Sequence, residues 1–181
     1  GWWSPRSRSG THAESGLRNN DRSFPEEVNR LVTEVCSDLL FCPTLTAFRT
    51  VKNTGRAYLT GDLMYEALKS VKNFDENLHN KYGVSKPYVL MTLHRRRNVD
   101  NVSTYGTILK TMGQIGYDVL YPVHPRAKLN LRRLDIPQNV ITIPPVGYVP
   151  FLSLLKNAKR VFTDSGGVQK EAYLLGTPCS T

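Results

Sequence analysis

The sequence has few of the features that mark secreted, membrane-spanning or metal-binding proteins. It contains only three cysteines, Cys36, Cys42 and Cys179, at spacings that suit neither a zinc site nor a disulfide framework. We therefore expect three core thiols, no metal, and a reducing, cytoplasmic compartment. No apolar run is long enough to span a bilayer. Residues 1–10 show no apolar stretch of the kind found in secretory signals, and we expect them to be irregular.

Acidic residues are also scarce. Aspartate and glutamate total 15 against 24 lysines and arginines, which gives a formal net charge of +9. This balance favours an anionic ligand without choosing among nucleic acid, a membrane surface and a phosphorylated small molecule. The positive charge is spread along the chain and no nucleic-acid recognition motif is present, so we expect neither nucleic acid nor membrane as a partner.

The sequence does contain a regular alternation of short apolar runs and amphipathic runs. It predicts strands within residues 38–43, 56–62, 88–94, 117–125, 139–145 and 158–163. It predicts helices over residues 24–36, 45–55, 63–83, 101–116, 149–158 and 168–175. Strands that alternate with helices indicate an α/β protein with mostly parallel sheets.

Two details of this prediction bear on organisation. In the helix over residues 24–36, Val28, Leu31, Val32 and Val35 form an apolar face. The helix over residues 63–83 becomes more charged toward its end, and the Gly83 to Pro87 stretch that follows is the best candidate for a domain boundary.

Polar segments lie where ligands bind in such folds, beyond the carboxyl ends of strands. We expect residues 11–18, 92–98, 123–126 and 163–167 to share one edge. In the last of these, Asp164 or Ser165 can cap the following helix, while Gly166 and Gly167 remove side chains from the turn. Outward-pointing backbone N–H groups there suit a phosphate, although an ordinary capped helix start has the same sequence. The segment matches neither a known phosphate loop nor a nucleophile elbow, so Ser165 is not predicted to be a nucleophile.

Side chains able to move protons lie in the same segments. His94 precedes Arg95, Arg96 and Arg97, which is typical of a diphosphate site or a proton-transfer site, and equally of a solvated basic turn. His124 repeats the pattern, with the solvated reading favoured. Glu14 and Glu26 lie near turns and suit a general base if they are partly buried; otherwise they are surface acids.

Four segments together resemble the non-hydrolysing UDP-N-acetylglucosamine 2-epimerases, in family order and with family-like spacing. They are HAESGLRNNDRSFPEEVNR, TLHRRRNVDN, YPVHPR and FTDSGGVQKEAYLLGTP, and the resemblance runs from about Thr11 to the end of the chain. It implies two Rossmann-like domains in a glycosyltransferase B-like architecture, with the active site in the cleft between them. It also implies that UDP-N-acetylglucosamine is the partner, that no cofactor is needed, and that full-length members are homodimers.

The resemblance implies interconversion of UDP-N-acetylglucosamine and UDP-N-acetylmannosamine, by elimination of UDP to 2-acetamidoglucal and re-addition. Inversion at C2 requires a proton to leave one face and return to the other, so several acid/base groups are expected. Glu14, Glu26 and His94 match the family's catalytic residues. The remaining matches are Ser165, Gly166 and Gly167 for the diphosphate, Glu171 for the ribose, Phe151 for the uracil, and Arg95 and His124 near an activator site.

The chain departs from the family pattern in several places. It lacks the family's first strand, its Gly-Thr-Arg-Pro turn and the aspartate of its His-Gly-Asp segment, and it stops before a further nucleotide-binding arginine. Arg97 stands where an acid is usual, Ser15 replaces alanine and Lys170 replaces an acid. These departures predict an incomplete first domain over residues 11–83 and a UDP-binding domain over residues 84–181 that is incomplete at its end.

Other functions stay open on this evidence. A catalytically dead fragment that only binds UDP or a UDP-sugar would carry the same nucleotide residues. A glycosyltransferase of the same architecture is disfavoured by the paired ESGLR and PEE segments, and a basic nucleic-acid binder by the spread of charge.

Overall fold

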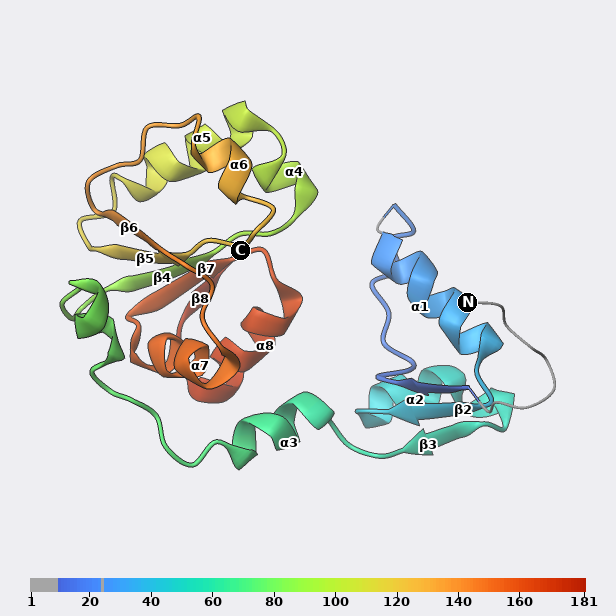
Figure 1. Ribbon diagram of the computed structural model, residues 1–181. Coiled ribbons are helices and arrows are strands. Elements are labelled where there is room, and N and C mark those ends of the chain that lie inside the picture. Colours follow the sequence, from blue (N-terminus) through green and yellow to red (C-terminus); the bar gives the residue numbers. More distant parts are fainter. Residues whose placement is uncertain (1–9, 24) are drawn as a thin grey trace. The chain divides into compact units, whose positions relative to one another are not determined.

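The computed structural model describes residues 10–23 and 25–181, and the chain divides into two compact units, residues 1–67 and 68–181 (Figure 1). The expected irregular arm over residues 1–10 lies outside the described residues except for Gly10, and so does Phe24, the expected start of the first helix. None of the helices in the described ranges is long and apolar enough to cross a membrane.

The first unit is built on a three-stranded parallel sheet in the order β1-β2-β3. The strands are β1 (Thr11–Ala13), β2 (Leu39–Cys42) and β3 (Ala57–Leu59). Helix α1 (Pro25–Cys36) connects β1 to β2, and α2 (Leu45–Val51) with the turn η1 (Lys52–Thr54) connects β2 to β3. A small core forms between β2 and α2 from Leu40, Cys42, Ala47 and Val51.

Helix α1 does not bury the face that its sequence pattern predicts. Val28, Val32 and Val35 are 41%, 56% and 76% exposed, whereas Glu27 and Glu34 are buried. The two carboxylates receive hydrogen bonds from the loop before α1, and those bonds compensate for the loss of solvent.

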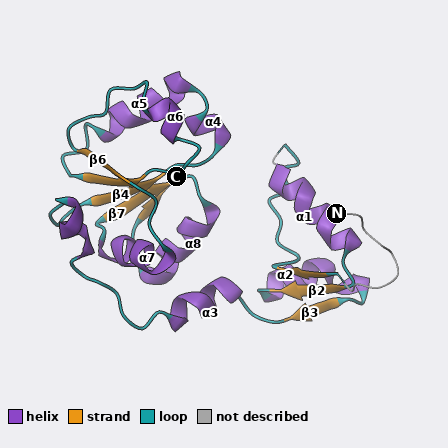
Figure 2. Ribbon diagram, viewed as in Figure 1, coloured by secondary structure: helices purple, strands orange, loops and turns teal. Residues whose placement is uncertain are grey.

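The second unit is a five-stranded sheet in the order β6-β5-β4-β7-β8, with every neighbouring pair parallel. The strands are β4 (Val89–Thr92), β5 (Val119–Pro122), β6 (Val140–Ile143), β7 (Arg160–Thr163) and β8 (Cys179–Ser180). One face is covered by α4 (Arg96–Val99), α5 (Val102–Met112) and α6 (Lys128–Leu131), the other by α7 (Tyr148–Asn157) and α8 (Gly166–Leu175) (Figure 2). The expected parallel α/β class is confirmed.

Two hydrophobic cores lie on the two faces of this sheet. Leu90 and Leu120 point into the core beneath α7 and α8, while Met91 and Tyr121 point into the core beneath α4, α5 and α6. Successive side chains on a strand alternate between faces, so a strand covered on both sides needs apolar residues at every position. This requirement explains the unbroken apolar runs in the sequence.

The strand order reverses beside β4. From β4 the chain builds outward through β5 and β6, then returns to place β7 on the other side of β4 and continues to β8. At such a switch point the connections leave two neighbouring strand ends in opposite directions, which opens a crevice between them. The carboxyl ends of β4 and β7 therefore mark the place where a ligand is expected.

The predicted long helix over residues 63–83 is broken. It consists of α3 (Leu63–Ser70), a non-helical stretch, and the turn η2 (Leu78–Tyr82). Asp75 accounts for the break: its carboxylate accepts from the backbone of Asn77 at 2.9 Å and its own backbone N–H donates to Ser153 at 3.0 Å. The stretch after α3 packs on the second unit's core through Phe74 and Leu78. The compact units accordingly divide before Leu68, earlier in the chain than the expected boundary at residues 83 and 84.

The elements that the sequence pattern did not predict are all short. They are β1, α4, α6 and β8, each of two to four residues. A segment of that length spans at most about one helical turn or one strand repeat, too little for a periodicity to be recognised.

A buried pair of tyrosines offers a test of the second unit's core. Tyr105 and Tyr121 are fully buried, and their hydroxyls lie 2.8 Å apart. Either single phenylalanine substitution leaves the other hydroxyl buried without a partner, at a cost of about 1–3 kcal/mol. The double substitution removes both hydroxyls, so it should cost less than the sum of the singles by about 1 kcal/mol or more in urea unfolding. Additive costs would show that the two hydroxyls do not depend on each other.

Candidate functional site

The carboxyl edge of the second sheet collects three of the four polar segments expected at one edge. Residues 93–98 follow β4, residues 123–126 follow β5, and residues 164–167 follow β7, all at the carboxyl edge of the second sheet. The fourth segment, residues 11–18, starts in β1 and so belongs to the separate sheet of the first unit.

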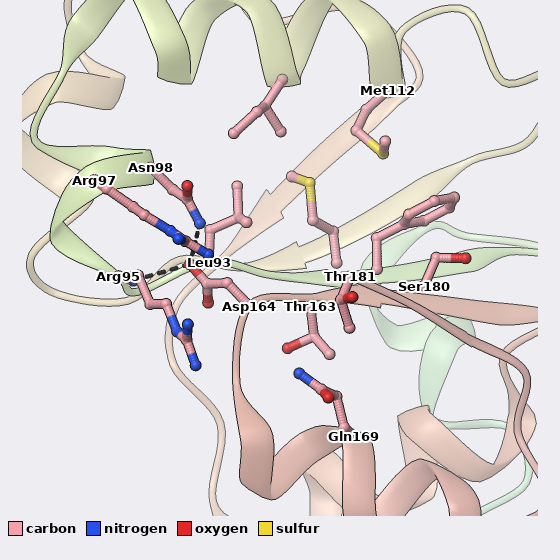
Figure 3. Close-up of a pocket in the computed structure, with 13 residues that line it drawn as sticks. Leu93, Arg95, Arg97, Asn98, Met112, Thr163, Asp164, Gln169, Ser180 and Thr181 are labelled. Carbon is pink, nitrogen blue, oxygen red and sulfur yellow. Dashed lines mark hydrogen bonds between the residues drawn. The ribbon is translucent and has the colours of Figure 1, made fainter. Parts of the chain in front are cut away.

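Asp164 ties the first and third of these segments together. Its carboxylate accepts from the backbone N–H of His94 at 3.1 Å. It also accepts from the backbone N–H of Arg95 at 2.9 Å and from the side-chain amide of Asn98 at 2.8 Å (Figure 3). The side chain is almost fully buried. Burial acts to raise the pKa of Asp164, but these hydrogen bonds and the nearby His94 outweigh it and hold that pKa below its usual range. Asp164 is therefore a charged carboxylate that fixes the loop after β4.

The same carboxylate orients the ring of His94. Nδ1 of His94 lies 2.7 Å from Oδ1 of Asp164. Because a carboxylate can only accept, Nδ1 carries the hydrogen, and in the neutral ring Nε2 is left with a lone pair. The His94 side chain is 44% exposed, so the ring is held on one side and accessible on the other.

His124 lies beside His94, and in its neutral form it is the other tautomer. The two ring centroids are 6.0 Å apart. The backbone N–H of Arg126 donates to Nδ1 of His124 at 3.2 Å, so a neutral His124 carries its hydrogen on Nε2. The structure thus brings together two histidines that the sequence singled out, one with a free acceptor and the other with a donor.

The turn after β7 leads directly into α8. Ser165 caps the helix, and its hydroxyl accepts from the backbone of Val168 at 3.4 Å. A side chain added at Gly166 would meet nothing within 4 Å, so the space over the first turn is open. The N–H groups of the first helical turn have no intrahelical partner, and the helix dipole adds a partial positive charge there. This combination suits an anionic oxygen.

Two further predicted residues lie on the helices of this face, Glu171 on α8 and Phe151 on α7. Glu171 is buried on α8, and burial raises the pKa of its carboxyl, an effect that the Tyr148 hydroxyl partly offsets by a hydrogen bond. Phe151 on the adjacent helix α7 is half-buried against the same core. The Tyr148 phenol of α7 thus reaches the Glu171 carboxyl of α8, and Phe151 lies on the same helix as Tyr148.

A cavity of about 430 Å³ opens beside Asp164 within the second unit (Figure 3). Its polar lining includes Arg95, Arg97 and Asn98, and its floor is apolar, with Met91 and Phe162. Neither Phe151 nor Glu171 contributes to this cavity, so it is not the space expected for the nucleoside.

The first unit holds Glu14 in an unusual backbone conformation. Glu14 has a φ of 62°, in the left-handed region that non-glycine residues seldom adopt. The turn continues through Gly16, whose φ is 81°, and a Cβ there would lie 2.0 Å from the carbonyl oxygen of Ala47 on α2. Only glycine fits this contact. The exposed Glu14 is therefore presented by a turn packed tightly against α2.

Two buried glutamates of α1 hold the loop that follows Glu14. Glu34 accepts from the backbone of Gly16 at 2.6 Å and binds both terminal nitrogens of Arg18, at 2.9 and 2.6 Å. Glu27 accepts from the backbone of Asn19 at 3.0 Å and from Arg30 at 2.8 Å. Burial opposes ionisation of Glu34, but the hydrogen bonds of Arg18 and Gly16 hold its pKa below the usual range.

Sequence reasoning missed the supporting acids Asp164, Glu27 and Glu34. Glu27 and Glu34 are seven residues apart, on one helix face, a pattern that could have indicated two carboxylates turned toward the protein. The predicted Glu26 lies exposed in the first turn of α1. Across residues 10–23 and 25–181, no group of three His, Cys, Asp or Glu side chains is placed to hold a metal ion.

Comparisons with known proteins identify the family. The model of the UDP-N-acetylglucosamine 2-epimerase family matches residues 9–181. The chain belongs to this family. It is 39% identical to a UDP-N-acetylglucosamine 2-epimerase homolog of Methanococcus maripaludis, with 94% of this chain and 52% of the relative aligned. It is 37% identical to the UDP-2,3-diacetamido-2,3-dideoxy-D-glucuronate 2-epimerase of Pseudomonas aeruginosa, over 94% of this chain and 50% of that enzyme.

A solved structure agrees with the sequence relatives. The Methanocaldococcus jannaschii UDP-GlcNAc 2-epimerase in complex with UDP-GlcNAc and UDP superposes with a TM-score of 0.77 at 35% identity. The match covers 93% of this chain and 52% of that one. The expected family and its glycosyltransferase B-like class of parallel-sheet units are thereby confirmed. The chain spans about half the length of the curated relatives it matches.

Because the carboxyl of Glu171 is buried, we predict that replacing it stabilises the folded chain, and that the gain depends on pH. Its pKa in the folded chain lies above the unfolded value, so its contribution is present below the unfolded pKa and is lost as pH rises through the folded one. Glu171→Gln should therefore raise Tm at pH 7.5 but change it little at pH 4, by about 2–4 °C for each kcal/mol of relieved penalty.

Tyr148→Phe is the matched control for this measurement. It removes the hydroxyl that favours the charged form of Glu171, so it should lower Tm at pH 7.5 and leave pH 4 nearly unchanged. Equal shifts at both pH values for Glu171→Gln would contradict this account of the carboxyl.

Proposed function

We propose that this chain is the nucleotide-binding part of a UDP-N-acetylglucosamine 2-epimerase, with the uridine diphosphate held by the second unit. The observation that carries the proposal is the position of the Ser165–Gly167 turn and His94 at the two strand ends of the switch point. In this proposal the N-terminal turn of α8 binds the diphosphate, Glu171 binds the ribose hydroxyls, and Phe151 contacts the uracil.

The chemistry assigned to the whole protein is elimination and re-addition of UDP. Loss of UDP from the sugar builds negative charge on the diphosphate, which the α8 N-terminus and a protonated His94 would stabilise. Glu14 and Glu26 act as the acid/base groups at C2, and Arg95 and His124 contact an activating nucleotide sugar. The three cysteines in the described residues are free thiols, but only Cys42 is buried and Cys36 is exposed, so the expectation of three core thiols is wrong. Free thiols suit a cytoplasmic protein.

A second candidate is a chain that binds UDP or a UDP-sugar without turnover. The observation that favours it is the span of the match, about half of each relative. Both candidates use the same nucleotide residues, so binding alone cannot separate them, whereas chemistry at C2 can.

The deciding experiment incubates the purified chain with UDP-N-acetylglucosamine in deuterated water and follows the sugar C2 proton by NMR. Loss of the C2 proton signal, with the mannosamine epimer appearing, supports the epimerase. Binding without exchange supports the second candidate. If the chain neither exchanges C2 nor binds UDP, both candidates are wrong. The diacetamido-glucuronate sugar nucleotide serves as an alternative substrate in the same assay.

Glu171→Ala tests the nucleotide residues directly. A carboxylate that accepts two ribose hydroxyls contributes about 1.5–3 kcal/mol, so UDP affinity should fall about 10- to 100-fold by calorimetry. The control is Tyr173→Ala on the same helix, because Tyr173 is 83% exposed and should leave the affinity unchanged. Unchanged UDP affinity for Glu171→Ala would place the ribose elsewhere.

A further inference from the structure

We propose that Asp164 is a positioning residue that holds His94 with the Nε2 lone pair toward the diphosphate, so that binding of a nucleotide sugar takes up one proton at His94. This inference rests on the proposed function for its ligand, and it adds a role for Asp164 that neither the motif nor the resemblance assigned.

Hydrogen-bond donors surround the carboxylate of Asp164. Oδ1 of Asp164 lies 2.7 Å from Nδ1 of His94, while Oδ2 accepts from Arg95 N–H at 2.9 Å and from Asn98 at 2.8 Å. Donors therefore occupy both oxygens. Nothing in this arrangement lets Nδ1 of His94 act as an acceptor, so the ring hydrogen is fixed on Nδ1 and the lone pair of a neutral ring is on Nε2.

A fixed tautomer has a consequence for an anionic ligand. The lone pair on Nε2 of a neutral ring repels a phosphate oxygen at hydrogen-bond distance. Adding a proton to Nε2 converts the repulsion into a charge-assisted hydrogen bond. The charged carboxylate of Asp164 stabilises the resulting imidazolium on its far side, as an aspartate does in a Ser-His-Asp triad. Ligand binding and protonation of His94 are therefore linked.

Two titratable side chains lie beside the ring of His94, Asp164 and His124, and Arg95 follows His94 in the chain. His124 in its neutral form carries its hydrogen on Nε2, so it is able to donate to an anionic ligand without a second proton. One proton per ligand is accordingly the expected uptake.

The substitution Asp164→Asn should change the tautomer of His94 without releasing the loop after β4. Its amide oxygen can keep the Arg95 and Asn98 bonds at the Oδ2 position, which leaves the NH₂ group facing Nδ1 of His94. The amide then donates to Nδ1, and the ring hydrogen moves to Nε2. In this variant a neutral His94 can bind phosphate without protonation. Asn98→Ala is the matched control, because it removes one bond to Asp164 but leaves the bond to Nδ1 in place.

The first measurement is ¹⁵N NMR of the histidine rings in the free chain, at a pH where they are neutral. The native chain and Asn98→Ala should show His94 with its hydrogen on Nδ1, and Asp164→Asn should show it on Nε2. A native chain with the hydrogen on Nε2 would overturn the proposal, and this reading needs no substituted protein to fold.

The second measurement is calorimetry of UDP-N-acetylglucosamine binding in buffers with different ionisation enthalpies. This ligand is chosen because its diphosphate is a diester and does not itself titrate near neutrality. At a pH where the NMR spectra show a neutral His94 ring in the free chain, uptake of about one proton per ligand is expected for the native chain and Asn98→Ala, and about none for Asp164→Asn. Binding by the native chain without proton uptake would overturn the proposal. If no nucleotide sugar binds, the proposed function fails together with the proton linkage, while the NMR result still decides the tautomer.

Discussion

The carboxylate of Asp164 is the interaction on which the second unit's site depends. It occupies the switch point, where the order of the parallel strands reverses beside β4, and it joins the loop after β4 to the turn after β7, two segments far apart in the chain. Three N–H donors and one ring nitrogen from residues 94–98 converge on it. The residue that fixes His94 is also the neighbour of the Ser165–Gly167 turn. Any shift of that turn on binding a phosphate would therefore move the support of His94.

The first unit uses the same device with different residues. Glu34 and Glu27 are buried acids that accept from the backbone of a loop, and Glu34 also binds Arg18 of that loop. The loop continues from the strained turn at Glu14. Removing one partner from such a group leaves an uncompensated buried charge, so these acids are expected to tolerate little change. Both units thus place a candidate proton-transfer group on a loop and fix that loop with a buried carboxylate. The strain at Glu14 is consistent with a functional position, because unusual backbone conformations persist only where surrounding contacts hold them.

Much of this arrangement could be predicted from the sequence, for reasons that particular residues make clear. The strands around Leu90, Leu120 and Val161 were predictable because strands covered on both faces must be apolar throughout. The capping of α8 by Ser165 followed from local chemistry. The burial of Glu27 and Glu34, and the bonds made by Asp164, were not predictable, because each depends on partners distant in the chain that no local pattern reveals. The break at Asp75 was missed for the same reason, since its backbone partner is Ser153.

The central claim is that the second unit holds a nucleoside diphosphate at the N-terminus of α8. Its most direct test is a comparison of ¹H–¹⁵N NMR titrations of the chain with UDP and with uridine. We expect both ligands to shift the amide signals around Phe151 and Glu171, and only UDP to shift those of Ser165, Gly166 and Gly167. Equal shifts of the three turn amides by both ligands, or UDP-induced shifts that leave this turn unchanged, would contradict the account.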